Sequence, residues 1–292
     1  MEIRRYKVAD HIFGVCSEKL CRMIGAIDGF RPFELEGQEL SEADFRFEYS
    51  LEKPQQYNVQ YSFDYEDILG EFGTTEEGFF LRQTPEGEEP LVMFTAHGSN
   101  VVLLYGNLSV RLLRFALWIG YGLMTASKGT IAIHSSCIVS DDKAVIFLGE
   151  SGTGKSTHTR LWRENIPGSF LLNDDSPIVR VIDGTTWVYG SPWSGKTPCY
   201  RQERYPLAAC VRLSQAPYNK IHKLHVIKGY AALHPSCPPE FAYDESLYSH
   251  ISATLSSLLK KVPVYHLECL PDSAAAWLSH NTVYSRQISI EP

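Results

Sequence analysis

The first third of the chain alternates apolar and polar positions with a period of two, and aromatic residues carry most of this pattern. Residues 1–107 contain 16 Phe and Tyr. They gather in runs bounded by Pro, Gly and acidic residues, at 45–49, 57–63, 78–82 and 91–94. Side chains of a strand point alternately to its two faces, so this spacing predicts short antiparallel strands. We therefore expect a small β-rich N-terminal domain over residues 1–107.

The period changes near residue 108, where apolar residues recur at the spacing of one helix face. They are Leu112, Leu113, Ala116, Leu117, Ile119, Gly120, Leu123 and Met124. Ser109 is a suitable N-cap and Lys128-Gly129 a suitable stop, so we predict a helix between 108 and 127. We expect this helix to begin a second domain, residues 108–292, and to pack under the sheet of that domain.

Two strand-like runs, 131–139 and 143–148, follow the predicted helix and are separated by a turn at 140–143. A two-residue turn at Asp141-Asp142 pairs Ser140 with Lys143 and, in the same register, places His134 opposite Gly149. This histidine would then lie beside the next glycine-rich segment. A purely structural, hydrogen-bonded histidine is the alternative interpretation.

That segment, residues 149–156, has the spacing G-x-x-x-x-G-K-[ST] and lies between a buried strand and a predicted helix. Backbone N–H groups of such a loop turn onto phosphate oxygens, the lysine adds positive charge and the serine can reach Mg²⁺. The pattern predicts a nucleoside triphosphate site; a glycine-rich turn without a ligand is the alternative. The predicted nucleotide-binding residues are Gly149, Glu150, Ser151, Gly152, Thr153, Gly154, Lys155, Ser156 and Thr157.

A second hairpin is predicted from 178–182, the turn Asp183-Gly184, and 186–189. Its register returns residues 191–196 to the neighbourhood of Asp174 and Asp175. Paired carboxylates after an apolar strand suit Mg²⁺, and one of them can act as a base. Many such pairs are instead turn or cap residues.

Positive side chains and one tryptophan follow this hairpin. Arginine on a loop facing a γ-phosphate would stabilise transition-state charge, which makes Lys196, Arg201 and Arg204 candidates; a surface ion pair is the alternative for each. Trp193 suits either stacking on adenine or the core, and we favour the core.

The last part of the chain has a predicted helix at 245–261, a strand at 262–267 and a short Ala-rich helix at 271–279. We place the strand at an edge, because Pro263 has no N–H to donate. The histidines of this part show no metal-ligand spacing, so we expect structural roles for His222, His225, His234, His250, His266 and His280.

Composition narrows the function classes. The 292 residues include seven cysteines, an odd number, with no C-x-x-C pair, which argues against a disulfide scaffold or a zinc site and favours a reducing cytoplasmic location. We expect no signal peptide and no membrane span, since the most apolar stretch, 115–124, is too short. Residues 1–107 carry 9 Lys/Arg against 20 Asp/Glu. Such an acidic part repels polyanions, so we expect no nucleic-acid partner.

The order of these features resembles the HPr kinase/phosphorylase catalytic domain and the ATP-dependent phosphoenolpyruvate carboxykinases. The similarity covers residues 128–176 and is weaker up to 213. It rests on His134, the hairpin, the segment 149–156 and Asn173-Asp174-Asp175. The resemblance implies a mixed α/β phosphate-loop domain, unlike that of the all-parallel NTPases, beside the smaller β-rich domain. Members of these families are often oligomers, so an oligomer is among the arrangements it allows.

The resemblance also implies roles for the site residues. Lys155 would contact the β- and γ-phosphates of ATP. Ser156 and Asp175 would hold Mg²⁺, with Mn²⁺ as an alternative ion. His134 would bind a second metal or the reacting phosphate, and Asp174 would be the base.

We therefore expect an ATP-dependent kinase that transfers the γ-phosphate to a hydroxyl, such as a serine of a protein, a peptide or a small metabolite. The β-rich domain would help to choose the acceptor. Two alternatives remain, a carboxykinase-like enzyme and an ATP-binding regulator that does not turn over.

Overall fold

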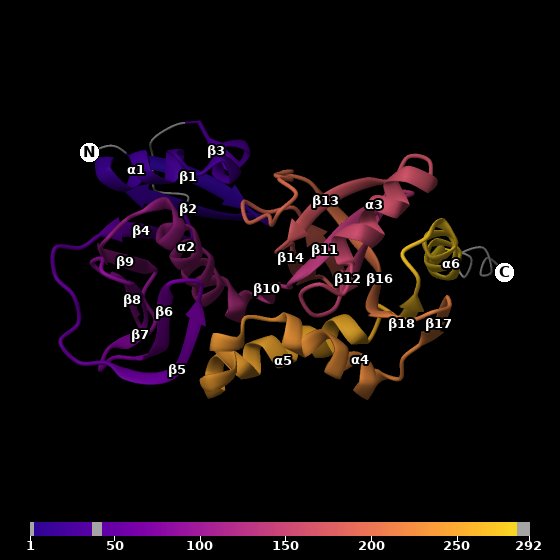
Figure 1. Ribbon diagram of the computed structural model, residues 1–292. Coiled ribbons are helices and arrows are strands. Elements are labelled where there is room, and N and C mark those ends of the chain that lie inside the picture. Colours follow the sequence, from indigo (N-terminus) through magenta and orange to yellow (C-terminus); the bar gives the residue numbers. More distant parts are fainter. Residues whose placement is uncertain (1–2, 37–42, 285–292) are drawn as a thin grey trace. The chain divides into compact units, whose positions relative to one another are not determined.

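A computed structural model describes residues 3–36 and 43–284 of the chain (Figure 1). Residues 1–2, 37–42 and 285–292, which belong to the two expected domains, lie outside the described part. The chain divides into two compact units. Unit 1 comprises Met1–Lys128 and Pro239–Ser249, and unit 2 comprises Gly129–Pro238 and His250–Pro292.

The observed boundary differs from the expected one at 107/108, because helix α2 (Val110–Thr125) belongs to unit 1. The helix packs against α1 (Glu18–Gly25) and against strands β7 (Gly78–Pro85) and β8 (Leu91–Ala96) of its own unit. Gly120 allows the close approach, since a Cβ there would lie 2.7 Å from the ring of Phe47. The amide of Gln83 also donates to the carbonyl of Leu112 at 2.9 Å.

Unit 1 is built on a nine-stranded sheet in the order β3-β1-β2-β4-β9-β8-β7-β6-β5. β4 pairs in parallel with both β2 and β9, so the expectation of purely antiparallel strands was wrong at this place. The strands are β1 (Ile3–Val8), β2 (His11–Cys16), β3 (Glu34–Leu35), β4 (Phe45–Tyr49), β5 (Asn58–Tyr65), β6 (Ile68–Thr74), β7 (Gly78–Pro85), β8 (Leu91–Ala96) and β9 (Val101–Gly106).

Aromatic side chains fill the interior of unit 1. Phe13 is stacked on Phe45 and meets Phe47 edge-on, with ring centroids 5.5 and 5.4 Å apart. Helix α1 (Glu18–Gly25) begins at Ser17, whose hydroxyl accepts from the backbone of Leu20, and a 3₁₀ helix (Asp28–Phe33) follows. Two further 3₁₀ helices, Ala126–Lys128 and Pro239–Tyr243, also belong to this unit.

Unit 2 contains a second mixed sheet of nine strands. Seven follow the order β10-β14-β15-β16-β12-β11-β13, and β18 pairs with both β16 and β17. Strand β12, which leads into residues 149–156, is parallel to β16 and antiparallel to β11. The strands are β10 (Thr130–Ala132), β11 (Ser135–Ser140), β12 (Lys143–Leu148), β13 (Phe170–Asp175), β14 (Ile178–Ile182), β15 (Thr185–Tyr189), β16 (Arg204–Gln215), β17 (Lys220–Lys223) and β18 (Val264–Cys269). The expected mixed α/β class is confirmed.

Both predicted hairpins of unit 2 are present with two-residue turns. Asp141 and Asp142 have φ of 47° and 55°, and Asp183 and Gly184 have φ of 49° and 71°. Two consecutive positive φ angles match the right-handed twist of the flanking strands, and Asp and Gly tolerate them best. Ser140 pairs with Lys143, as the turn chemistry predicted.

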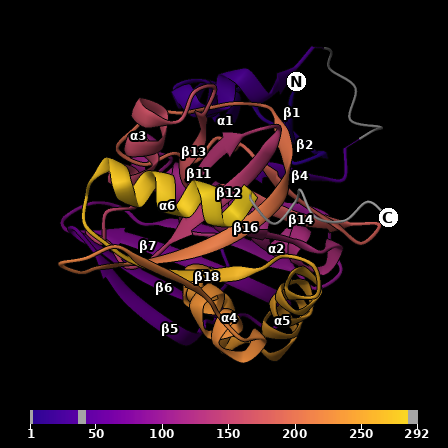
Figure 2. The same cartoon turned by 90° about the vertical axis from the view of Figure 1, so that its right-hand side faces the viewer.

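Helices α3 (Lys155–Asn165) and α6 (Ser273–Tyr284) pack together against this sheet, and Figure 2 shows α6 crossing in front of β12 and β16. Trp162 of α3 is fully buried in this core beside Phe147 and Val211. Helix α4 (Val226–Leu233) contacts β18, and α5 (Glu245–Leu259) runs from unit 1 into unit 2.

Strand β18 was predicted to be an edge strand, and this prediction was wrong. It lies between β16 and β17, hydrogen-bonded to both. Pro263 precedes the strand by one residue and so breaks no ladder, while its carbonyl accepts from the backbone N–H of Cys210 at 3.0 Å. Proline therefore marked the start of this strand and not an edge.

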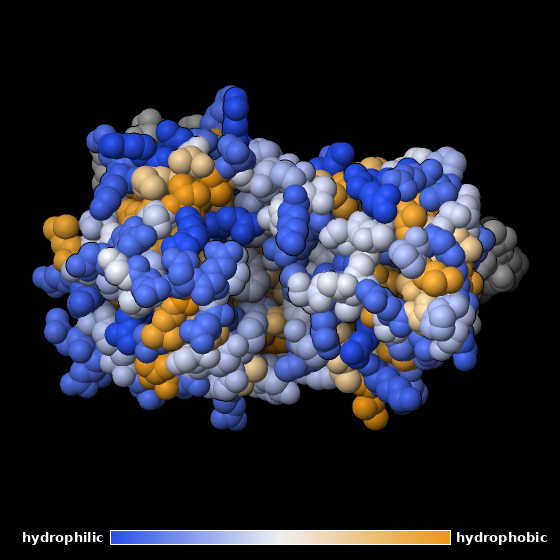
Figure 3. Space-filling view, in the orientation of Figure 1, coloured by the Kyte–Doolittle hydropathy of each residue, from blue (hydrophilic) through white to orange (hydrophobic). Residues whose placement is uncertain are grey.

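The surface carries polar and apolar residues side by side over the face shown in Figure 3. Large exposed apolar residues such as Leu51 and Ile227 are scattered, which is usual for globular proteins. Among the described residues no helix is long and apolar enough to cross a membrane. The seven cysteines all lie in the described part of the chain, and none of them forms a disulfide there.

Candidate functional site

The segment 149–156, called here the glycine loop, connects β12 to the first turn of α3. Its three glycines have φ of 150°, 81° and 101° at Gly149, Gly152 and Gly154, a region that residues with a Cβ rarely adopt. A Cβ on Gly152 or Gly154 would meet nothing within 4 Å, so the backbone there faces open space. The first N–H groups of α3 have no intrahelical partner, which makes this loop a suitable anion cradle.

Lys155 folds back over the glycine loop. Its Nζ donates to the carbonyl of Gly149 at 2.8 Å and to that of Glu150 at 3.2 Å. Burial lowers the pKa of the ammonium, while the charges of Asp175 and Asp174 act in the opposite direction. The cation therefore lies near both carboxylates and can exchange loop carbonyls for an incoming anion.

Ser156 and Asp174 join the helix to the sheet at the bottom of the loop. The hydroxyl of Ser156 donates to Oδ1 of Asp174 at 3.0 Å. Asp174 is only 5% exposed, and it pairs with Ser136 of β11. Carboxylate and hydroxyl oxygens are the hard donors that Mg²⁺ prefers.

Asp175 and His134 form a second, more exposed pair. Nδ1 of His134 and Oδ1 of Asp175 are 3.2 Å apart, and the side chains are 48% and 32% exposed. Asp175 has φ of 140°, a conformation that normally requires glycine. Such backbone strain costs about 1–3 kcal/mol and gathers at functional sites.

These pairings differ from the arrangement implied by the resemblance, in which Ser156 and Asp175 share a metal and Asp174 is the base. Consecutive strand residues point to opposite faces, which fits the separate partners of Asp174 and Asp175. In the structure Asp174 accepts a hydrogen bond from Ser156, and Asp175 pairs with His134. It does bring Lys155, Ser156, Asp174, Asp175 and His134 to one end of the sheet.

Asn173, to which the sequence analysis gave no role of its own, organises the segment beside the acidic pair. Its buried amide donates to the hydroxyl of Ser191 and to the carbonyl of Trp193, both at 3.2 Å, and its Oδ1 accepts from the backbone of Ser176. The fold thereby returns 191–196 to the acids, as the hairpin register predicted, through a bridge between Asp175 and Ser194. A polar residue inside an apolar strand was the available indication of this role.

The cationic candidates are placed differently from one another. Lys196 is exposed and follows Gly195, whose backbone N–H donates to the carbonyl of Asp174. Arg201 lies 4.9 Å from the ring of Phe170 and pairs with Glu203. Arg204 lies over the ring of Trp187 and donates to the hydroxyl of Tyr189. Of the three, Lys196 follows a residue in direct contact with the acidic pair.

Trp193 is 2% exposed, which confirms its prediction as a core residue.

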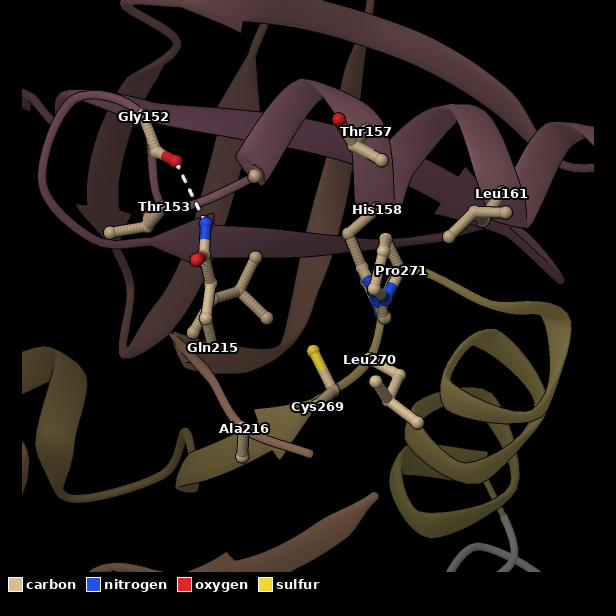
Figure 4. Close-up of a pocket in the computed structure, with 12 residues that line it drawn as sticks. Gly152, Thr153, Thr157, His158, Leu161, Gln215, Ala216, Cys269, Leu270 and Pro271 are labelled. Carbon is tan, nitrogen blue, oxygen red and sulfur yellow. Dashed lines mark hydrogen bonds between the residues drawn. The ribbon is translucent and has the colours of Figure 1, made fainter. Parts of the chain in front are cut away.

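A pocket of about 530 Å³ adjoins the glycine loop (Figure 4). Gly152, Thr153, Gly154 and Thr157 form one wall, and the ends of β16 and β18 form the opposite wall with Leu213, Gln215, Ala216, Cys269, Leu270 and Pro271. The amide of Gln215 donates to the carbonyl of Gly152 at 3.2 Å and holds the two walls together. The pocket has both apolar walls and polar groups, as small-molecule sites do.

Fold and site together define a two-unit mixed α/β protein with a glycine loop beside clustered carboxylates. No protein-family model matches the chain, and a search of curated proteins finds no significant match.

Proposed function

We propose that this protein is an ATP-dependent phosphotransferase that transfers the γ-phosphate to a hydroxyl acceptor. The observation that carries the proposal is the convergence of Lys155, Ser156, Asp174, Asp175 and His134 at one end of the glycine loop. Phosphoryl transfer needs positioning and charge neutralisation more than covalent help from the protein, and these groups supply both.

The structure supports distinct roles for the two carboxylates. Asp174 and the hydroxyl of Ser156 would hold Mg²⁺, because they are adjacent, both offer oxygen and the carboxylate is buried. The ion would neutralise charge on the phosphates. Lys155 would leave the carbonyls of Gly149 and Glu150 and bind the transferred phosphate.

The exposed His134–Asp175 pair would accept the proton of the attacking hydroxyl. A carboxylate bonded to one ring nitrogen orients the imidazole and leaves the other nitrogen for proton transfer. With 48% of its side chain exposed, His134 is accessible to an acceptor from solvent.

The nucleoside would lie in the 530 Å³ pocket, since that pocket shares Gly152, Thr153 and Gly154 with the glycine loop. Residues of the glycine loop line the pocket, and Lys155 and Ser156 of the same loop lie near the acids, which suits a ligand that carries a chain of phosphates. The mixed sheet with the order β11, β12, glycine loop, α3 and β13 also supports the phosphate-loop fold of the HPr kinases and carboxykinases.

The first experiment measures ADP release from Mg·ATP with free serine, serine peptides, an HPr-like protein and oxaloacetate as acceptors. We expect transfer to a hydroxyl that is lost in Lys155→Ala and is strongly reduced at low Mg²⁺ concentration in Asp174→Asn. The matched control is Asp183→Asn, which changes an exposed hairpin carboxylate and keeps a side chain that tolerates positive φ.

The other outcomes separate the alternatives. Phosphorylation coupled to loss of CO₂ from oxaloacetate would instead establish a carboxykinase. ATP binding that depends on Lys155, without turnover on any acceptor, would favour a regulator.

A further inference from the structure

Three potential metal ligands come together on strands β17 and β18 of the second sheet, outside the site described above. His222 lies on β17, and His266 and Glu268 lie on β18. One donor atom from each of the three lies within 4.8 Å of the others. We call this set the His-His-Glu cluster.

The strand register explains why these side chains meet. His222 is directly opposite His266 in the antiparallel pair of β17 and β18. Glu268 follows His266 by two residues, so both project from the same face of β18. The two rings have centroids 5.4 Å apart and planes at 72° to each other.

Neighbouring residues fix the orientation of two of the three side chains. Nε2 of His266 is 2.8 Å from the hydroxyl of Ser214 on β16, and Tyr218 donates to Oε1 of Glu268 at 3.0 Å. Metal-binding imidazoles and carboxylates typically have such outer partners, which set ring plane and tautomer. A metal would take Nδ1 of His266, because Nε2 is engaged by Ser214.

The kinds of donor atom in the cluster, and the charged residues beside it, bear on which ion it could bind. Arg212 is opposite His266 on β16 and Lys220 is opposite Glu268 on β17, and both are exposed cations. Ca²⁺ and Mg²⁺ need several oxygen ligands, whereas this cluster offers two imidazoles and one carboxylate. Two imidazoles and a carboxylate suit Zn²⁺.

We propose that the His-His-Glu cluster is a Zn²⁺ site with three protein ligands and one open coordination position. Zinc bonds of about 2.0–2.1 Å place tetrahedral donors roughly 3.4 Å apart, so the present donors must move closer together. His222 is exposed and can rotate to do so, while Ser214 and Tyr218 hold the other two side chains. The inference does not depend on the proposed function.

Bound zinc would link β17 to β18, because its ligands come from both strands. Among the described strands β17 pairs only with β18, and residues 216–219 connect it to β16. Ala216, at the start of this connection, lines the 530 Å³ pocket. The ion would therefore order one wall of that pocket and raise the thermal midpoint of the full chain.

The test titrates the purified, EDTA-treated full chain with ZnCl₂ by calorimetry, in the presence of excess Mg²⁺. We expect one Zn²⁺ per chain and at least a tenfold loss of affinity in His222→Ala and in Glu268→Gln. Both variants change accessible side chains, and circular dichroism checks that they fold. His225→Ala is the matched control, because this exposed histidine lies three residues from His222 and outside the cluster.

Two further variants exclude other ligands. Cys269→Ser removes the neighbouring thiol and Asp175→Asn alters the acidic pair, and neither is expected to change zinc affinity. Unchanged affinity in both His222→Ala and Glu268→Gln would overturn the proposal, as would loss of the site in Cys269→Ser or Asp175→Asn.

Discussion

The hydroxyl of Ser156 donates to Oδ1 of Asp174 at 3.0 Å, and this bond links the first turn of α3 to the end of β13. A seryl oxygen and a buried carboxylate at this distance can share one hard cation once the proton of the serine turns away. The carboxylate that we propose as the Mg²⁺ ligand thus has a different partner from Asp175, which pairs with His134.

Asp174→Asn is expected to act mainly through Mg²⁺. Replacing one anionic oxygen weakens the binding of Mg²⁺. The Mg²⁺ concentration for half-maximal ADP formation should therefore rise at least tenfold, which is equivalent to about 1.4 kcal/mol of binding free energy. Activity should recover in part at high Mg²⁺. Initial rates over a range of Mg²⁺ concentrations measure this, with Asp183→Asn as control; an unchanged Mg²⁺ requirement would show that Asp174 is not a ligand.

His134 and Asp175 are expected to act as one unit. His134→Gln and Asp175→Asn should each lower kcat, and the double variant should be little worse than the poorer single variant, since either change disables the pair. Steady-state kinetics of the two single variants and the double variant measure this, and fully additive losses would contradict a shared role.

The pair of turns in unit 2 shows what local sequence determines. Asp141-Asp142 and Asp183-Gly184 favour positive φ whatever surrounds them, and the register of each hairpin follows from the turn. The position of His134 beside the acids and the return of residues 191–196 were predictable for this reason. The glycine loop was equally local, because its conformation needs only its own glycines.

Contacts between distant segments were not predictable in the same way. An apolar helix face fits either sheet equally well, and α2 packs on unit 1 because Gly120 meets Phe47, a match of shape that periodicity does not encode. The parallel pairing of β4 with β2 and β9 involves no hairpin turn, so no turn motif in the sequence indicates it. His222 and His266 are 44 residues apart and meet only through the β17–β18 register.

A buried polar junction makes Ser279 important for stability. Nε1 of Trp162 donates to its hydroxyl at 2.9 Å, and Nε2 of His158 is also 2.9 Å away. Ser279→Ala leaves both ring nitrogens buried without this partner, at a cost of about 1–3 kcal/mol for each group. We expect unfolding in urea to show a loss of roughly 2–6 kcal/mol. Ser256→Ala on the exposed side of α5 is the control and should change stability little; equal effects would disprove the role of the junction.

His158 should make the protein less stable in mild acid. Burial lowers the pKa of this imidazole from 6.5 to about 4 in the folded protein. Between these values the unfolded chain binds the additional proton, so the free energy of unfolding is fully retained above pH 6.5 and falls as the pH drops towards 4. The shift corresponds to up to about 3 kcal/mol.

Glu240 acts in the opposite direction, because burial raises the pKa of its carboxyl from 4.5 to about 7. The folded protein then holds the additional proton between pH 4.5 and 7, and stability from this group is lost as the pH rises through that window. Because the two groups act in opposite directions, the contribution of His158 is measured by comparing the pH dependence of stability of the wild type with that of His158→Gln. His158→Gln should be less stable than the wild type at pH 7, and its loss of stability from pH 6.5 to 4 should be smaller. Urea unfolding at intervals across this range measures both slopes, and parallel slopes would show that His158 does not remain neutral in the fold.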